Sequence, residues 1–431
     1  MLVIEISSKL IQNSDKVLIM NVLGVFGGIG SMMIGAKKQG WHVIGNIEDR
    51  PMFYTGTFQA NYPDAFMVHS REELTEEQLE QCKGVDLILG HPKCGSFSTM
   101  RHQNTTLADA RKELAGNFSK FIDCVVEFKP KFFAIDNLPK SLTEFTYKDW
   151  AEKLPDYDIH FEFISNRNYG NAQLRKRLFV IGSRKELGFY FIPSEFENNE
   201  TLIERLNKIS ADAPNNQQWK KSDVVEGWYR HELDPSFTAH RTPGDKITYA
   251  EFEEYLKTQK INKSLQCYNK KGLLTTRIGK CLIDVNRTAK TVNGGNTGHH
   301  YMFRNDTYMP FTIRERAAIG GCPDDFIFIP NKEPEIKTWH NDLIHQTGKF
   351  MPVEFTTFLT QQIKDFLEGT RDEANYTHKR LVKPNEEVDE NKFMYCREVG
   401  YTNQEKVCEF CGSKAYCKLR KWNEKQQQID F

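Results

Sequence analysis

The stretch that decides the fold is NVLGVFGGIGSMMIGAKKQGWHVIGNIED, residues 21–49. Its first five residues are an apolar run typical of a buried strand, and the glycine-rich segment VFGGIG overlaps the end of that run. A helix-type segment and a second apolar run, HVIGNIED, come next. A strand, a glycine turn, a helix and a second strand predict two parallel strands joined by a crossover helix. The sequence therefore predicts an α/β fold.

Further strands are predicted along the first part of the chain. The apolar runs are VDLILG at 85–90, FFAID at 132–136, YDIHFEFIS at 157–165 and RLFVIG at 177–182. An amphipathic pattern at 117–128 predicts a helix between the first two of these runs. Strands that alternate with helices favour a mostly parallel sheet covered by helices on both faces. Residues 1–185 are therefore predicted to form a catalytic domain that binds a cofactor.

The pattern changes after residue 185. Residues 186–285 are polar and weakly periodic, which predicts a separate small domain. Residues 286–370 become ordered again and end in an amphipathic helix, VEFTTFLTQQIKDFLEG, so they are predicted to complete the catalytic domain. Residues 371–431 are predicted to be a charged linker followed by a cysteine-rich tail.

Composition is typical of a globular enzyme, with 431 residues, 39% hydrophobic and 27% charged. Lys+Arg and Asp+Glu are equal at 58 each, so net charge does not indicate a partner. Residues 257–290 hold nine basic residues and one acid, which indicates either a surface for phosphates or a solvated lysine-rich face. No apolar run reaches the ~18 residues that a membrane span requires. We also expect no secretory leader, and reduced thiols in a cytoplasm-like compartment.

Two features indicate a nucleoside-containing cofactor. The glycines of VFGGIG let a ligand approach the backbone at the amino end of a helix. The second strand ends in Glu48 and Asp49, and an acid at this place suits ribose hydroxyls. These features do not choose between a nicotinamide dinucleotide and S-adenosylmethionine, nor between Glu48 and Asp49.

Reactive side chains stand near the ends of three other strands. Cys94 lies in HPKCGSFS and is flanked by proline, lysine and glycine, which is unusual for a buried structural thiol. Asp136 ends another strand, and Arg175 and Arg177 stand around the start of a third. Strand ends of an α/β sheet gather in one crevice, where ligands bind. The sequence thus predicts one thiol, one carboxylate and two guanidinium groups at a single site.

The chain resembles the DNA (cytosine-5) methyltransferase family, because eight segments follow in the order of the family's motifs. They are VFGGIG at 25–30, GHPKCGSFS at 90–98, LADARKEL at 107–114, FFAIDNLP at 132–139, QLRKR at 173–177, RTAKTV at 287–292, FTIRERAAIGGCPDDFIF at 311–328 and IHQTGKFMP at 344–352. The resemblance implies a Rossmann-like class I methyltransferase domain with a smaller target-recognition domain at 186–285. It also implies a closing helix that packs back on the cofactor domain.

The resemblance implies methylation of carbon 5 of a flipped-out cytosine in double-stranded DNA, through a covalent adduct at Cys94. Asp136 would hold the ring, Arg175 the base or its phosphate, and Arg177 would brace the loop. S-adenosylmethionine is the implied cofactor. Its expected contacts are Phe26, Gly28, Ile29, Gly30, Glu48, Asp49, Ser70, Lys93, Leu114 and Lys349.

Four departures from the family pattern bear on the chemistry. Lys93 replaces the proline before the nucleophile, Asp136 replaces a glutamate, and His69 with Ser70 stands where an acid is expected near the adenine. Lys349 replaces an asparagine close to the methionine part of the cofactor. A cation there is unfavourable beside a sulfonium unless an anion balances it. That anion is either an Asp or Glu of this chain or the extra carboxylate of carboxy-S-adenosylmethionine.

Several alternatives stay open at this point. A cofactor with an extra carboxylate would make the product 5-carboxymethylcytosine. A second alternative is that the protein catalyses the same reaction on RNA. A third is that it is a non-catalytic relative that only binds DNA. Four thiols in the tail predict either a structural zinc site or unligated cysteines, and they are Cys396, Cys408, Cys411 and Cys417. We expect a cytoplasmic monomer of a bacterial or phage-infected cell that serves restriction–modification or phage DNA modification.

Overall fold

The computed structural model describes most of the predicted catalytic domain and parts of the remaining chain. It covers residues 19–92, 107–139, 141, 145, 147–193, 200–216, 239–240, 246–247, 266–268, 274–275, 289–292, 301–304, 307–330, 336–351, 353–371, 395–396 and 400–401. Cys94 with its neighbours Lys93 and Gly95, most of the basic stretch 257–290 and three of the four tail cysteines lie outside these residues.

A seven-stranded sheet with the order β3-β2-β1-β4-β5-β8-β6 forms the centre of the molecule. Only β8 runs antiparallel to its two neighbours, β5 and β6, so the predicted mostly parallel α/β fold is confirmed. The strands are β1 (Asn21–Val25), β2 (His42–Ile47), β3 (Phe66–Val68), β4 (Leu87–Gly90), β5 (Phe132–Asn137), β6 (Tyr157–Ser165) and β8 (Lys176–Arg184).

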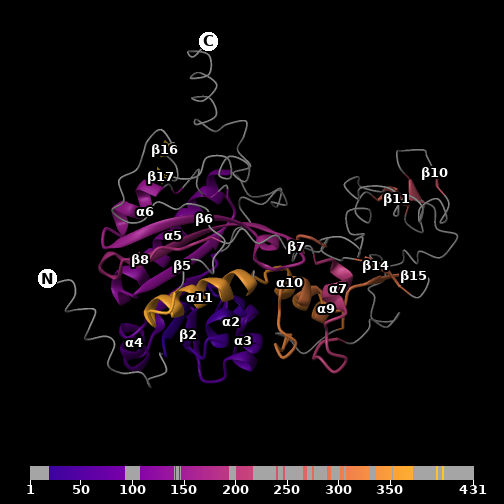
Figure 1. Ribbon diagram of the computed structural model, residues 1–431. Coiled ribbons are helices and arrows are strands. Elements are labelled where there is room, and N and C mark those ends of the chain that lie inside the picture. Colours follow the sequence, from indigo (N-terminus) through magenta and orange to yellow (C-terminus); the bar gives the residue numbers. More distant parts are fainter. Residues whose placement is uncertain are drawn as a thin grey trace, which may run out of the picture.

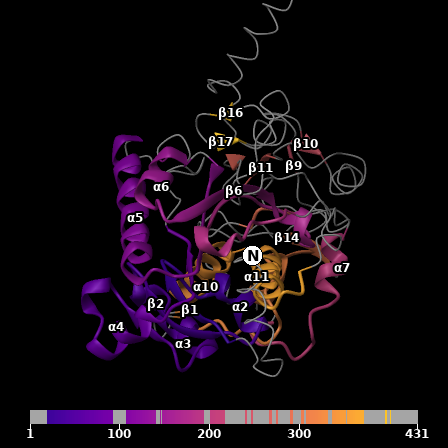
Figure 2. The same cartoon turned by 60° about the vertical axis from the view of Figure 1, so that its left-hand side comes forward.

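Helices cover both faces of this sheet. Figure 2 shows α5 and α6 on one side of the strands and α10 and α11 on the other. The helices are α2 (Ile34–Lys38), α3 (Thr55–Asn61), α4 (Glu76–Lys83), α5 (Leu107–Phe128), α6 (Tyr147–Lys153), α7 (Leu202–Leu206), α9 (Ile313–Ile319), α10 (Ile336–Gly348) and α11 (Val353–Leu367).

Two apolar clusters sandwich the sheet, because successive side chains of a strand point to opposite faces. Leu87 and Leu89 of β4 join the cluster that contains residues of α11, whereas Ile88 joins the cluster that contains residues of α5 and α6. The strands are thus buried on both faces, which explains their nearly continuous apolar sequences. Burial on both faces holds the strand ends, and the polar residues that follow them, in fixed positions.

Short strands lie outside the central sheet. A four-stranded antiparallel sheet has the order β10-β9-β11-β12, from β9 (Ala239–His240), β10 (Lys246–Ile247), β11 (Gln266–Tyr268) and β12 (Leu274–Thr275). The β14 (Tyr301–Arg304) and β15 (Thr307–Pro310) strands form a hairpin, as do β16 (Tyr395–Cys396) and β17 (Gly400–Tyr401). A parallel pair links β7 (Gln173–Leu174) to β13 (Ala289–Lys290).

The α11 helix packs against α2, and Figure 1 shows the two helices side by side. Gly35 of α2 permits this approach, since a Cβ at this residue would lie 2.6 Å from the carbonyl carbon of Thr356 in α11. Phe355, Leu359 and Ile363 of α11 are fully buried in the same cluster as the sheet residues. The chain after residue 286 therefore contributes to the core around the first strands.

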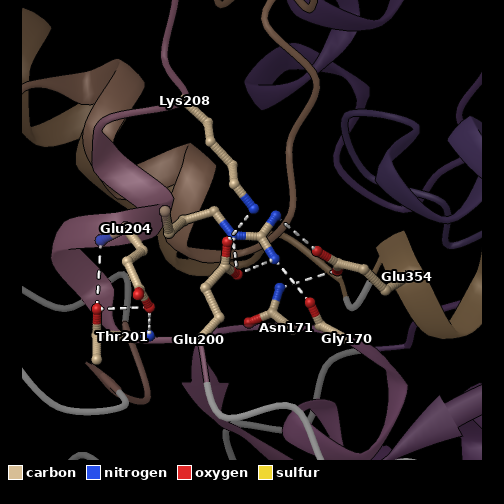
Figure 3. A network of polar contacts seen from close by, with 8 residues as sticks. Gly170, Asn171, Glu200, Thr201, Glu204, Lys208 and Glu354 are labelled. Atoms are coloured by element: carbon tan, nitrogen blue, oxygen red, sulfur yellow. Dashed lines mark hydrogen bonds and ion pairs between the residues drawn. The ribbon is translucent and has the colours of Figure 1, made fainter.

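A network of ion pairs and hydrogen bonds fixes α7 to this core (Figure 3). Arg205 pairs with Glu200 at 2.7 Å and with Glu354 of α11 at 3.1 Å, and it donates to the Gly170 carbonyl at 2.7 Å. Asn171 donates to the other oxygen of Glu354 at 2.8 Å. Burial raises the pKa of Glu354, and these donors satisfy its carboxylate.

We predict that Gly35→Ala destabilises the protein by about 1–3 kcal/mol, because an added methyl overpacks the α2–α11 contact. Gly116→Ala is the matched control, since Gly116 lies within α5 and a Cβ there would meet no atom within 4 Å. The control should gain about 0.4–1 kcal/mol. Urea denaturation of the three proteins measures both changes, and equal stability of the two variants would contradict the contact.

Candidate active site

The glycine turn after β1 is built against the side chain of Asn46 in β2. Asn46 accepts a hydrogen bond from the Gly27 amide at 3.0 Å and donates to the Gly28 carbonyl at 3.1 Å. Phe26, Gly28 and Gly30 have positive φ angles of 59°, 57° and 87°, so the turn is tight and two of these places favour glycine. Asn46 is not among the predicted site residues, although a polar residue inside an apolar strand was the available signal.

Glu48 lies under this turn and is only 3% exposed. Its carboxylate accepts hydrogen bonds from the Gly28 amide at 2.7 Å and from the Arg50 amide at 3.3 Å. Desolvation and, secondarily, Asp49 raise the pKa of Glu48 to about 8. The side chain of Asp49 is about one-third exposed and pairs with Arg50 at 3.8 Å. Of the two acids that the sequence offered, Glu48 is the one against the turn.

The residues around the turn fit a nucleoside. A Cβ at Gly28 would meet no atom within 4 Å, so space beside the turn is open to a ligand. A buried carboxylate next to that space can accept hydrogen bonds from ribose hydroxyls. Ile29 is buried, Ser70 follows β3 and is half-buried, and Leu114 is fully buried in the cluster that contains Phe26.

Lys349 reaches the same region from the far end of the chain. Its Nζ donates to the Tyr54 hydroxyl at 2.6 Å and lies 5.2 Å from the centre of that ring. Its charge lowers the pKa of Glu48, which is a minor effect beside desolvation. His345 stacks on Tyr54, and burial, then Lys349, then Arg50 lower the pKa of His345 to about 4. Tyr54 and His345 are not among the predicted site residues.

The ends of β4 and β5 bring His91 against Asp136. The register pairs Gly90 with Ile135, so the residues that follow each of them are neighbours at the same edge of the sheet. The Nδ1 atom of His91 contacts the Oδ1 atom of Asp136, whose side chain is fully buried. Cys94 follows His91 by three residues and lies outside the described residues. His91 is not among the predicted site residues, although a histidine directly after a buried strand was the available signal.

The two arginines take different places around Asp136. The Nε atom of Arg177 lies 3.4 Å from Asp136 Oδ2, so this guanidinium is the one beside the carboxylate. Arg175 donates to the carbonyls of Val292 at 3.2 Å and Gly348 at 3.3 Å. It thereby ties the region of β7 to the segment that carries Lys349. The predicted contact of Arg175 with a base or phosphate stays a prediction.

Burial sets the charge of His91. Desolvation lowers the pKa of His91, Asp136 opposes this change, and Arg177 and Arg175 reinforce it. The net direction favours a neutral imidazole at neutral pH. A carboxylate that accepts from Nδ1–H fixes the tautomer and leaves Nε2 with a free lone pair. The Nε2 atom of His91 can therefore accept a proton.

The predicted metal site lies almost entirely outside the described residues. Only the backbone of Cys396 is described, in β16. Within the described part of the chain, no group of three or more His, Cys, Asp or Glu residues could hold a metal ion. In the same part, every helix is too short or too polar to cross a bilayer.

Comparisons with known proteins agree on one family. The family model of C-5 cytosine-specific DNA methylases matches residues 20–365. The Type II methyltransferase M.NgoPII of Neisseria gonorrhoeae is 25% identical over 81% of this chain and 96% of its own length. The Type II methyltransferase M1.HphI of Haemophilus parahaemolyticus is 24% identical over 72% and 79%. The Entamoeba histolytica methyltransferase EhMeth superposes with a TM-score of 0.52 at 11% identity over 82% and 100%, which shows the fold.

We predict that Glu48→Gln changes how stability depends on pH. Between the unfolded pKa near 4.5 and the folded pKa of about 8, the folded protein holds a proton that the unfolded chain has released. The wild-type free energy of unfolding should therefore fall as pH rises through this window. The variant should lack this fall and gain roughly 1 kcal/mol or more at pH ~8.

Urea denaturation at several pH values measures this effect, with Glu80→Gln as the control because Glu80 is exposed. Above the folded pKa of about 8, where the carboxyl group of Glu48 is ionised, the same variant should bind the cofactor about tenfold more weakly, since an amide replaces a buried carboxylate acceptor. Identical pH slopes for wild type and Glu48→Gln would show that the carboxyl group ionises normally.

Proposed function

The chain belongs to the C-5 cytosine-specific DNA methylase family and is a DNA cytosine methyltransferase, and we propose that it works through a covalent adduct at Cys94. The observation that supports this proposal is the cluster of His91, Asp136 and Arg177 at the ends of three neighbouring strands. Cys94 follows His91 so closely that the nucleophile loop starts at this cluster.

The proposed chemistry answers a specific difficulty. Carbon 5 of cytosine is a poor nucleophile until a thiolate adds to carbon 6 and makes an enamine. An ordinary cysteine has a pKa near ~8.5, so its ionisation needs a base or a positive neighbourhood. Lys93 is adjacent in sequence, and Arg175 and Arg177 are buried at the same site. Negative charge that develops on the ring would be stabilised by the same groups.

Methyltransferases of this family use S-adenosylmethionine, which supplies an electrophilic methyl group on a sulfonium. In this chain, the turn at Phe26–Gly30 would hold the nucleoside, and Glu48 would accept hydrogen bonds from its ribose. Lys349 and Tyr54 would border the same ligand. Ser70, Lys93 and Leu114 remain proposed contacts.

The proposed substrate is double-stranded DNA. Asp136 is fully buried and the side chains of His91 and Arg177 are mostly buried, so a base paired inside a duplex is out of reach of this cluster and must be flipped out. Residues 186–285 would select the sequence, and the basic stretch that continues to residue 290 would contact phosphates. We propose a monomer that works in the cytoplasm.

Cys94→Ser should abolish modification of DNA, because a neutral hydroxyl is a far weaker nucleophile than a thiolate. Nucleosides from DNA treated with the purified enzyme and S-adenosylmethionine are analysed by mass spectrometry, and the wild type should yield 5-methylcytosine. Cys82→Ser is the control, since Cys82 is a buried thiol of α4.

Modification by Cys94→Ser at the wild-type rate would contradict the covalent mechanism. A wild-type protein that binds DNA and never modifies it would instead support the non-catalytic alternative. Modification of RNA in preference to DNA would contradict the proposed substrate and leave the covalent mechanism in place.

Lys349 supports a second candidate, transfer of a carboxymethyl group from carboxy-S-adenosylmethionine. Its ammonium lies at the cofactor end, where Glu48 has a raised pKa and is therefore mostly neutral at pH 7. When Glu48 is neutral it does not balance the charge of Lys349, and the extra carboxylate of the ligand would supply the missing anion. The product would be 5-carboxymethylcytosine.

We predict that Lys349→Asn changes the choice between the two cofactors. In a mixture of both, the wild type should form 5-carboxymethylcytosine, and the variant should form mainly 5-methylcytosine, a shift of about tenfold or more for loss of one buried ion pair. Product masses measure the ratio. A wild type that makes only 5-methylcytosine would reject the second candidate and leave methylation intact.

A further inference from the structure

Asp136 is hidden behind His91 and Arg177. Its side chain has no exposed surface, one carboxylate oxygen contacts His91 Nδ1, and the other faces Arg177 Nε. The imidazole of His91 keeps 11% of its surface exposed. A group that approaches the cluster from outside therefore reaches the imidazole before the carboxylate.

The contact between His91 and Asp136 has the geometry of an oriented base. A buried carboxylate that accepts from Nδ1–H holds the ring in one tautomer and stabilises the imidazolium that forms when Nε2 takes a proton. The charged groups that face His91 are Asp136 from β5, and Arg175 and Arg177 from the chain around β7 and β8. Lys93 and Cys94 follow it in the chain.

A thiol is close enough along the chain to use this base. Two residues separate His91 from Cys94 in the sequence, so the length of the chain limits the distance between their Cα atoms to about 11 Å. A nucleophile, a base and a group that orients the base are the parts of an activated-cysteine site. The neutral form that burial favours for His91 is the form that accepts a proton.

We propose that His91 is a catalytic residue that carries one proton between the Cys94 thiol and nitrogen 3 of the cytosine ring, and that Asp136 positions it. This inference rests on the proposed covalent mechanism. It assigns the carboxylate an indirect role, which suits a side chain that is one methylene shorter than glutamate and is fully covered.

The proton and the electrons balance over the cycle. His91 Nε2 takes the proton of the Cys94 thiol, and the thiolate uses an electron pair to form the bond to carbon 6. The imidazolium then gives the same proton to nitrogen 3, which receives the displaced charge. After carbon 5 has gained the methyl group, solvent removes the carbon 5 proton and the bond between sulfur and carbon 6 breaks. The proton on nitrogen 3 returns through His91 to the thiolate.

The test is the pH dependence of adduct formation with DNA that contains 5-fluorocytosine, measured for wild type and His91→Asn. Asparagine keeps an N–H close to the position of Nδ1, so a purely structural role toward Asp136 survives, whereas the second ring nitrogen is lost. We expect the variant to react about 100-fold more slowly at neutral pH. The acidic limb of the variant's pH–rate profile should move up toward the ordinary thiol pKa of ~8.5, because the thiol must then ionise without the base.

His160→Asn is the matched control, since His160 pairs with Glu162 on β6 in a similar histidine–carboxylate contact at 3.2 Å. It should leave the rate and the profile unchanged. Two results for His91→Asn would overturn the inference. One is the wild-type pH–rate profile, and the other is a rate of adduct formation that falls equally at every pH while the acidic limb stays where it is.

A measurement on the wild type keeps the inference testable if His91→Asn does not fold. The pKa of His91 from its ring resonances should equal the pKa of the acidic limb of adduct formation, and a mismatch would overturn the inference. The two proposals fail differently. A wild type that forms no adduct defeats the proposed function, whereas a normal adduct with an indifferent His91 defeats only this inference.

Discussion

Burial of the Asp136 carboxylate is the constraint on which the rest of the site depends. An ionised carboxylate without solvent is stable only with charged or hydrogen-bonding partners close by. Those partners are His91 and Arg177, and they come from the end of β4 and the start of β8. The order β4-β5-β8 in the sheet is the arrangement that brings all three together. The reactive groups thus lie together because β4, β5 and β8 are neighbouring strands of the sheet.

The cofactor end of the site also contains a buried carboxyl group, that of Glu48, but its surroundings differ from those of Asp136. Burial, and secondarily Asp49, raise the pKa of Glu48 even though the Gly28 amide donates to its carboxyl group. At the other end of the site, the guanidinium of Arg177 lies beside Asp136. Lys349 follows α10 and acts electrostatically on Glu48, and Arg175 donates to the carbonyl of Gly348, the residue directly before Lys349. One arginine therefore links the two ends of the site.

The sequence predicts the sheet well, because apolar runs and glycine turns are local signals. It also singles out Asp136 and the pair Glu48 and Asp49, since these acids stand at the ends of buried strands, but it does not choose between Glu48 and Asp49. His91 had a local signal of the same kind, a polar residue directly after a buried strand, and was overlooked. Tyr54 and the different places of Arg175 and Arg177 could not be predicted, because they depend on contacts between segments far apart in the chain. Asn46 was missed for a related reason. A polar residue inside a strand has a meaning only when the turn that it holds is seen.

The central claim is that the sulfur of Cys94 bonds to the cytosine ring. The most direct measurement is peptide mapping by mass spectrometry of the enzyme trapped on 5-fluorocytosine DNA, in which fluorine blocks removal of the carbon 5 proton. The account predicts that the nucleotide is attached to the peptide that contains Cys94, at the sulfur. Attachment at another residue, or no attachment by an enzyme that still modifies ordinary DNA, would contradict it.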